Sequence, residues 1–192
     1  MTLWCLLLIS QAYLIRKGLK QTHRLMGRLS YALAPFVALA TINLVHFRMK
    51  GAPLSNVPLY FMALMLNAVV AFSVFYSLAM YHRHRAPLHA RYMVCTAFPL
   101  FTPVTDRLIF SQFPSLINSV PVLDGNPQVQ VVGFLLADAI LLALAIWDWR
   151  SNKRKDVFPI ALGVMVLYHA SVLTFYRIPA WKDFCEWFVA KG

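Results

Sequence analysis

The sequence predicts an all-α integral membrane protein, a bundle of six transmembrane helices followed by a short C-terminal helix at the membrane interface. The chain of 192 residues is 60% hydrophobic, and only 13% of its residues are Asp, Glu, Lys or Arg. That charged fraction is about half of what soluble domains carry. The basic residues gather in short turns between long apolar runs, a pattern typical of membrane topology signals. Because a soluble domain of this size cannot bury so much apolar surface, we expect residues 1–192 to form a single polytopic membrane domain.

Six apolar runs approach the ~20 residues that a helix needs to cross ~30 Å of hydrocarbon. They cover Met1–Ile15, Leu29–Val45, Leu59–Met80, Tyr92–Phe110, Val131–Trp147 and Phe158–Phe175. The first run is short, but it lacks a basic leading region and a small-residue cleavage site, so it favours a retained helix over a removed signal peptide. The segment Pro179–Ala190 carries spaced aromatic residues, which predicts an amphipathic helix lying at the interface.

The basic turns fix the expected orientation. Most Lys and Arg residues fall in the first, third and fifth turns, which contain residues 16–28, 83–91 and 150–155. Basic turns stay in the cytoplasm, so both chain ends are expected outside. The fourth connection, residues 112–130, contains three prolines and one glycine and is expected to be an irregular external loop. The formal charge of +11 therefore serves topology, and no nucleic acid partner is expected.

Polar side chains recur in the outer halves of four predicted helices. These residues are Asn43, His46, Asp106, Arg107, Asp138 and His169. At 1.5 Å per residue, Asp106 lies ~6 to 9 Å, Asp138 ~10 Å and His169 ~9 to 10 Å from the outer helix ends. A charged group in hydrocarbon usually faces a partner or a water-filled cavity. We expect an ion pair between Arg107 and Asp138 or Asp106, with His169 beside it; such a pair serves either helix packing alone or a ligand, proton or redox site.

Two prolines precede Asp106 on the same predicted helix. Pro99, Pro103 and Asp106 share one helix face at spacings of four and three residues. Pro103 has no amide donor and leaves the carbonyl of Pro99 unpaired. The sequence therefore predicts a loosened helix face that lines a pocket.

Four histidines fall at the predicted inner surface among arginines: His23, His82, His84 and His89. Imidazole can bind haem iron, and His23 and His89 precede two helices that start on the same side. They are the expected axial ligands of a haem b. The alternative is that these histidines and arginines meet anionic lipid headgroups.

Other chemical signatures are missing from the sequence. It contains no H-E-x-x-H, G-x-S-x-G, P-loop or C-x-x-C motif, so the motif search indicates neither catalytic residues nor a separate metal site. The three cysteines are too few and too scattered for a disulfide framework.

Several stretches resemble an uncharacterised family of bacterial multi-pass membrane proteins, a domain of unknown function. They are L-L-L-I-S-Q-A-Y-L-I-R with T-H-R-L-M-G-R-L-S-Y, L-H-A-R-Y-M with a later D-R-L, A-D-A-I-L-L-A-L-A-I-W-D-W-R, and P-A-W-K-D-F-C-E-W-F. The resemblance implies the bacterial inner (plasma) membrane and one further helix before Met1, which would leave the turn assignment unchanged. It implies no established activity. Helix number and histidines link the chain to haem-b membrane cytochromes.

Two functions from different classes follow. The first is a b-type-cytochrome-like redox component that binds haem through the inner histidines. The second is a non-catalytic accessory subunit of a membrane-protein partner, or a small-solute or proton pathway through the Asp/Arg/His cluster. An enzyme acting on lipid at the inner surface is third. In every case the lipid bilayer is the surrounding partner.

Overall fold

The fold is built almost entirely from helices. In the computed structural model, residues 2–190 are described. The α-helices are α1 (Thr2–Arg16), α2 (Lys20–Gly27), α3 (Ser30–Met49), α4 (Asn56–Tyr81), α5 (Ala86–Cys95), α6 (Thr102–Gln112), α7 (Gln130–Asn152), α8 (Phe158–Thr174) and α9 (Pro179–Ala190). Three 3-10 turns complete the helical part: η1 (Phe98–Leu100), η2 (Pro114–Ser119) and η3 (Phe175–Arg177). The expected all-α class is confirmed.

Four helical stretches within residues 2–190 are long and apolar enough to cross a membrane. They are Lys20–Met49, Asn56–Tyr81, Gln130–Asn152 and Phe158–Arg177. A fifth arises if Ala86–Leu100 and Thr102–Gln112, bent by 46° relative to one another, count as one broken span. Helix α1 has 15 residues and is therefore ~22 Å long, less than the hydrocarbon thickness. The chain thus has the apolar helices of a membrane-embedded protein, with four to five spans by length and composition.

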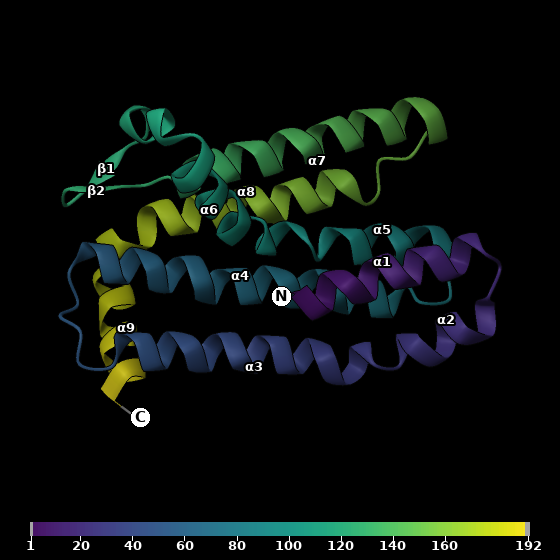
Figure 1. The fold of residues 1–192 in the computed structure, drawn as a ribbon, viewed down its shortest axis with the longest axis horizontal. Coiled ribbons are helices and arrows are strands. Elements are labelled where there is room, and N and C mark those ends of the chain that lie inside the picture. The colour runs from purple at the N-terminus through teal and green to yellow at the C-terminus, as the bar shows by residue number, and fades with distance from the viewer. Residues whose placement is uncertain (1, 191–192) are drawn as a thin grey trace.

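Helix α4 forms the centre of the bundle. It packs against α3, α5 and α8, and α7 packs against α8 (Figure 1). Many of its apolar residues are buried, and Met62, Ala63, Phe75 and Ala79 are fully buried. The largest hydrophobic core joins α4 to α5, α7 and α8. A helix that is apolar on every side reaches its lowest free energy in this central position.

Helix α1 is held to the bundle by one tryptophan. Trp4 is fully buried, and its ring meets Phe72 of α4 edge-on with centroids 5.0 Å apart. Its indole Nε1 donates a hydrogen bond to Oγ1 of Thr96 at 3.0 Å. A buried indole needs such a partner for its N–H, so this contact fixes how deeply α1 lies beside α4 and α5.

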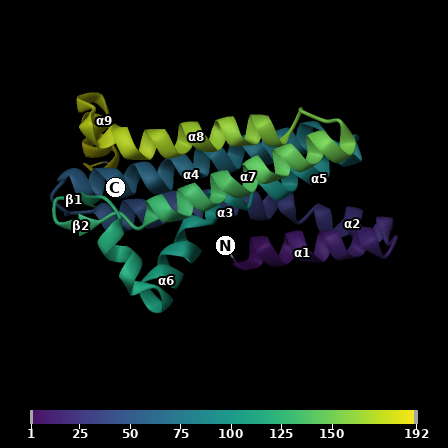
Figure 2. The same ribbon diagram turned by 90° about the horizontal axis from the view of Figure 1, so that it is seen from above.

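The span predicted as one helix over Tyr92–Phe110 is broken in the middle. Helix α5 ends at Cys95, η1 follows, and α6 restarts at Thr102 with Pro103 in its first turn. Proline lacks an amide donor and is well tolerated at the start of a helix but not inside one. The single shared face predicted for Pro99, Pro103 and Asp106 is therefore wrong, because the two prolines end one helix and begin another. Figure 2 shows α6 leaning away from the bundle.

The connection between α6 and α7 is more ordered than the expected irregular loop. It contains η2 and an antiparallel two-stranded ribbon of β1 (Val122–Leu123) and β2 (Asn126–Pro127). The turn residues Asp124 and Gly125 have φ values of 46° and 79°. Asp-Gly favours such left-handed geometry at both central positions of a tight hairpin, so the sequence carried a hairpin signal that the proline content obscured.

Helix α9 runs across the ends of α3, α4 and α8, with the bounds predicted for the tail helix (Figure 1). Trp181 donates a hydrogen bond from Nε1 to the carbonyl of Leu59 at 3.1 Å, and Cys185 is fully buried. We call this end of the bundle the α9 end. The opposite end carries the turns 17–19, 82–85 and 153–157 (Figure 1), and we call it the basic end.

Candidate functional site

Two members of the predicted polar cluster bind one another. Nδ1 of His169 on α8 lies 3.0 Å from Oδ2 of Asp138 on α7, and their side chains are 7% and 26% exposed. Phe134 stacks on the imidazole with centroids 4.1 Å apart and an interplanar angle of 19°. The other carboxylate oxygen of Asp138 is buried without a hydrogen-bond partner among the described residues. The histidine is thus held in one orientation, while the carboxylate keeps a free acceptor.

Asp106 finds a different partner from the one expected. Its Oδ2 accepts a hydrogen bond from Nε2 of Gln130, the first residue of α7, at 3.0 Å. The contact depends on close packing between the two helices. A Cβ added to Gly133 would clash with Oγ1 of Thr105 and would lie 3.4 Å from its Cβ and 3.7 Å from Cα of Thr102. Glycine at 133 therefore lets α6 approach α7 and places Asp106 beside Gln130.

Two tyrosines complete this site from the core side. Tyr60 on α4 and Tyr168 on α8 are both buried, and the ring of Tyr168 packs against Phe134 of α7 with centroids 5.9 Å apart. The hydroxyl of Tyr168 donates to the carbonyl of Leu64 at 3.1 Å, and the buried Thr102 lies against Gly133 of α7. We call Tyr60, Thr102, Asp106, Gln130 and Tyr168 the four-helix polar site, because α4, α6, α7 and α8 all contribute to it.

The four-helix polar site has more acceptors than donors. Oδ1 of Asp106, Oε1 of Gln130 and the hydroxyl of Tyr60 are buried and make no hydrogen bond with the residues 2–190. Gln130 is 5% exposed and Tyr60 is 1% exposed. Each unpaired buried polar group costs ~1–3 kcal/mol. Such groups are rare in stable cores, and the two on the hydrogen-bonded side chains of Asp106 and Gln130 can receive a donor.

The predicted ion pair of Arg107 does not form. The arginine is exposed on α6, and among the described residues it makes no salt bridge to Asp106 or Asp138. Instead, Gln130 binds the carboxylate of Asp106 and His169 binds the carboxylate of Asp138. The 46° bend turns α6 away from the bundle, so consecutive residues 106 and 107 face different surroundings. A guanidinium a few residues from a helix end can reach the headgroup level along its own stem.

Asn43 and His46 lie apart from the other members of the predicted cluster. Both are on α3, which packs against α4 and α9, whereas Asp138 and His169 are on α7 and α8. Asn43 is exposed in an apolar groove with Phe36, Leu39 and Phe47. His46 meets the ring of Phe188 at 5.5 Å. The depth calculation placed all these residues at one level, but level alone does not fix the side of the bundle.

The four histidines of the basic end are held by four different neighbours. In the amide orientation that satisfies both of its ends, Gln11 donates to Nδ1 of His23 and accepts from the amide of Gly27 at 3.0 Å. His82 stacks on Tyr92 with centroids 5.7 Å apart. Nε2 of His84 accepts from Nε of Arg83 at 3.2 Å. No described contact joins two of these histidines.

The hydrogen bonding of one histidine at the basic end is compatible with a haem ligand. Nδ1 of His89 lies 2.8 Å from the carbonyl of Ala79; the carbonyl can only accept, so Nδ1 carries the proton and Nε2 keeps a free lone pair. A carbonyl that accepts from the other ring nitrogen is typical of iron-binding imidazoles. Nδ1 of His23 faces the side-chain amide of Gln11 instead. Residues 2–190 contain no group of three or more His, Cys, Asp or Glu that could hold a metal ion. The expected pairing of His23 with His89 through a haem stays a prediction.

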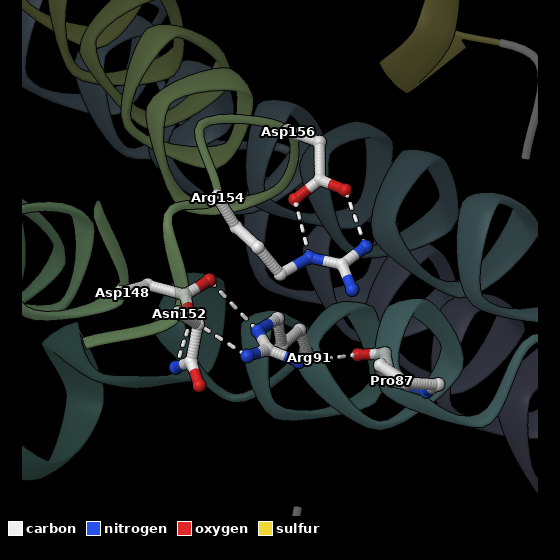
Figure 3. A network of polar contacts seen from close by, with 6 residues as sticks. All are labelled: Pro87, Arg91, Asp148, Asn152, Arg154 and Asp156. Carbon is white, nitrogen blue, oxygen red and sulfur yellow. Dashed lines mark hydrogen bonds and ion pairs between the residues drawn. The ribbon is translucent and has the colours of Figure 1, made fainter. Parts of the chain in front are cut away.

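The strongest ionic contact was missed by the sequence reasoning. Arg91 on α5 binds Asp148 on α7 with Nη2–Oδ1 and Nε–Oδ2 distances of 2.6 and 2.9 Å. Asn152 also donates to Oδ1 at 2.7 Å, and Nη1 of Arg91 donates to the carbonyl of Pro87 at 3.0 Å. Figure 3 shows the guanidinium between the two helices. Arg91 was assigned to a headgroup-facing turn; the signal against that assignment was a lone Asp in W-D-W-R beside a basic turn.

A second ion pair follows immediately on the loop to α8. Arg154 binds Asp156 with an Nη2–Oδ2 distance of 2.5 Å, and the side chains are 30% and 45% exposed (Figure 3). The guanidinium holds the pKa of the Asp156 carboxyl below its usual range. Because both groups meet water, this pair orders the loop more than it stabilises the fold.

Gln130 and Tyr60 were also missed as site residues. Neither type is informative alone, since Gln130 stands at the border of a loop and Tyr60 at the start of an apolar run. The spacing of Gln130, Gly133 and Phe134 on one helix face was the available signal, because a glycine there marks the close approach of another element.

Comparison with known proteins adds no relative. No protein-family model, no curated protein and no solved structure matches this chain. The resemblance to the bacterial multi-pass family therefore stays a prediction, and the function must be argued from the geometry above.

Proposed function

We propose that this chain is a multi-pass protein of the bacterial inner membrane with six spans, in which α1 is the short sixth span and α9 lies at the outer surface. The apolar, lipid-sized helices support the membrane assignment. The gathering of basic turns at one end supports a cytoplasmic basic end. The aromatic residues of α9 and its position across the helix ends support an interfacial helix.

We infer that the protein provides a small-solute or proton pathway, entered from the α9 end. The observation that carries this proposal is the row of buried and half-buried polar groups on α6, α7 and α8, from Asp106 and Gln130 to the bonded pair Asp138 and His169. Ionisable side chains inside membrane helices are costly and mark ion or proton routes. The residues of this row lie on three elements, so the row is a site and not one polar helix face.

The chemistry of the row suits the passage of a proton. The imidazole of His169 and the carboxylate of Asp138 are close enough to exchange a proton along their 3.0 Å contact. Oδ1 of Asp138 has no described partner and can accept a proton from a donor arriving from the α9 end. Stacking on Phe134 holds the imidazole against rotation. The exchange therefore requires only movement of hydrogen atoms along contacts that already exist.

The route is closed toward the basic end. Between Asp138 and Asp148 the sequence of α7 is apolar throughout, and so is α8 from Phe158 to Leu167. The core there includes Leu141, which is fully buried. Passage across the membrane consequently needs a conformational change. The α5–α6 break, where the helix is interrupted and bends by 46°, is the place where we propose this change occurs.

Proton movement by the purified chain in lipid vesicles tests this proposal. With a pH-sensitive dye inside the vesicles and an imposed pH difference, the wild type should acidify the lumen faster than empty vesicles do. Asp138→Asn should reduce the excess rate about tenfold or more, since it removes the group that exchanges the proton. Asp138→Glu should restore part of it. Asp183→Asn changes an exposed carboxylate on α9 and serves as the matched control.

Two results would oppose the pathway. If the wild type is no faster than empty vesicles, no proton passes. If Asp138→Asn lowers the thermal midpoint but leaves the rate unchanged, the contact with His169 only stabilises the helix packing. Helix packing alone was one of the two roles that the sequence predicted for this cluster.

A second candidate, a haem b bound at the basic end, is supported by one observation. Nδ1–H of His89 donates a hydrogen bond to the carbonyl of Ala79, which leaves the lone pair of Nε2 free to bind iron. Bound haem would supply one-electron transfer. Protein from haem-supplemented cells should then show a Soret band that His89→Ala abolishes, and equal loss in His23→Ala would support the expected pairing. A colourless wild type, or a band that His89→Ala preserves, contradicts haem binding through His89.

A further inference from the structure

We propose that the four-helix polar site binds a small cation that carries N–H donors, an ammonium ion or a primary amine. This inference rests on the proposed function, because it names the class of solute that the pathway takes. It starts from the two oxygens that remain unpaired where Asp106 meets Gln130. They come from α6 and α7, and both are acceptors that a ligand with N–H donors would satisfy.

The unpaired groups of the site are acceptors. Oδ1 of Asp106 and Oε1 of Gln130 can only accept, and the hydroxyl of Tyr60 can accept as well as donate. The amide donor of Gln130 is already used on Asp106, and the hydroxyl of Tyr168 already donates to Leu64. An anion or a carbonyl would meet further acceptors and would be repelled. A group with several N–H donors can satisfy the carboxylate and the amide oxygen together, because the hydrogen bond between Gln130 and Asp106 holds the two side chains side by side.

The charge of the surroundings favours a cation. Asp106 carries the site's formal charge, and no described salt bridge neutralises it. Of the seven acidic residues, all except Asp148 and Asp156 lie in the half of the bundle nearer the α9 end. They are on α6, the β1–β2 turn, α7 and α9. Clefts lined by one sign of charge concentrate ions of the opposite sign. The nearest cationic side chain in sequence, Arg107, is exposed on α6 and does not pair with Asp106.

Aromatic side chains border the core on this side of the bundle. Tyr60 of α4 and Tyr168 of α8 are buried in the same hydrophobic cluster as Phe134 of α7, and aromatic rings attract ammonium groups through their faces. The close approach of α6 to α7 at Gly133 and Thr105 leaves no room for a bulky substituent on that side. A bare metal ion is less suited, because residues 2–190 offer no cluster of three ionisable metal ligands here.

Binding of methylammonium to the purified chain tests the inference. Thermal unfolding is followed by the reaction of a fluorogenic maleimide with the buried Cys95 and Cys185, in a Cys5→Ser background that removes the exposed thiol. At constant ionic strength, methylammonium should raise the midpoint in a saturable way, because a ligand that binds only the folded state stabilises it. Tetramethylammonium has the same charge but no N–H group, and it should not raise the midpoint.

Two variants locate the effect. Asp106→Asn should weaken methylammonium binding at least ~10-fold, since hydrogen bonds to a charged acceptor are the stronger kind. Gln130→Met removes the amide oxygen at similar volume and should weaken it as well. Each midpoint shift is compared with the variant's own ligand-free midpoint, and isothermal titration of folded protein gives the affinity if a variant is less stable. Asp183→Asn should bind as the wild type does.

The outcomes separate this inference from the pathway itself. Equal stabilisation by tetramethylammonium, equal affinity in Asp106→Asn, or no response to methylammonium overturns the amine assignment. If the proton experiment succeeds and methylammonium does not bind, the pathway stands and its solute is the proton. If methylammonium binds with the predicted selectivity while no proton moves, the ligand assignment stands and proton passage fails.

Discussion

Replacing Asp148 by alanine should destabilise the protein more than any other single loss of charge. The carboxylate is 3% exposed and makes a two-point contact with Arg91, which is 19% exposed. Removing one partner of a buried ion pair costs ~3–5 kcal/mol. Because Arg91 keeps some contact with water, we expect about 2–3 kcal/mol here. A change of this size lowers the midpoint of a 150–250-residue domain by roughly 4–12 °C.

A double-mutant cycle in detergent measures the pair directly. Thermal midpoints are compared for the Cys5→Ser background, Asp148→Ala, Arg91→Met and the double variant. The midpoint of the double variant should fall by less than the sum of the decreases in the two single variants, because the double variant leaves no buried charge behind. The exposed pair at Asp156 supplies the control, since Asp156→Asn should change the midpoint much less. Should Asp148→Ala cost under about 0.5 kcal/mol, the pair does not join α5 to α7 as argued.

Three further outcomes follow from contacts described above. Gly133→Ala should cost ~1–3 kcal/mol by overpacking, and Thr105→Ala in the same chain should recover most of that loss in thermal unfolding. Trp181→Phe should cost about 1 kcal/mol through loss of its hydrogen bond to Leu59; limited proteolysis that releases the C-terminal helix no faster than in the wild type would contradict this. The depressed pKa of Asp156 gives stability that is present above pH ~3.9 and is lost as the pH falls further. Midpoints of wild type and Asp156→Asn should therefore differ slightly at pH 6 and converge near pH 3; a gap that widens in acid has the wrong sign.

The sequence predicted which segments are helical but not how each one lies. Apolar runs located α3, α4, α7 and α8 because lipid-facing and core-facing helices share one composition. The α9 bounds followed from a proline start and spaced aromatics. The fourth run was expected to be continuous, and it breaks because Pro99 and Pro103 sit where two helices can end and begin. The local sequence was therefore enough to predict which segments are helical, whereas the bend between α5 and α6 depends on how neighbouring helices pack.

The site was predicted in part for a similar reason. Depth along a helix follows from residue number, so Asp138 and His169 were placed at one level and do meet. Direction around the axis does not follow as easily. His46 shares that level but faces α9, and Arg107 turns outward with α6. The pair of Arg91 and Asp148 escaped notice because Arg91 was counted with a basic turn, although it lies on α5 and meets a carboxylate of α7.

The dry stretch of α7 from Ala139 to Trp147 has an electrical consequence. Those nine residues and the carboxylates that flank them make a low-dielectric plug ~15 Å long. The voltage across an energised membrane falls mainly where no mobile charge or water screens it, so on the proposed pathway, with water reaching the polar row from the α9 end, most of the drop would lie within this plug. Occupancy of the polar row near α9 should thus be nearly indifferent to the membrane potential, whereas any charge that crosses the plug would take up most of the ~2.3 kcal/mol available per 100 mV.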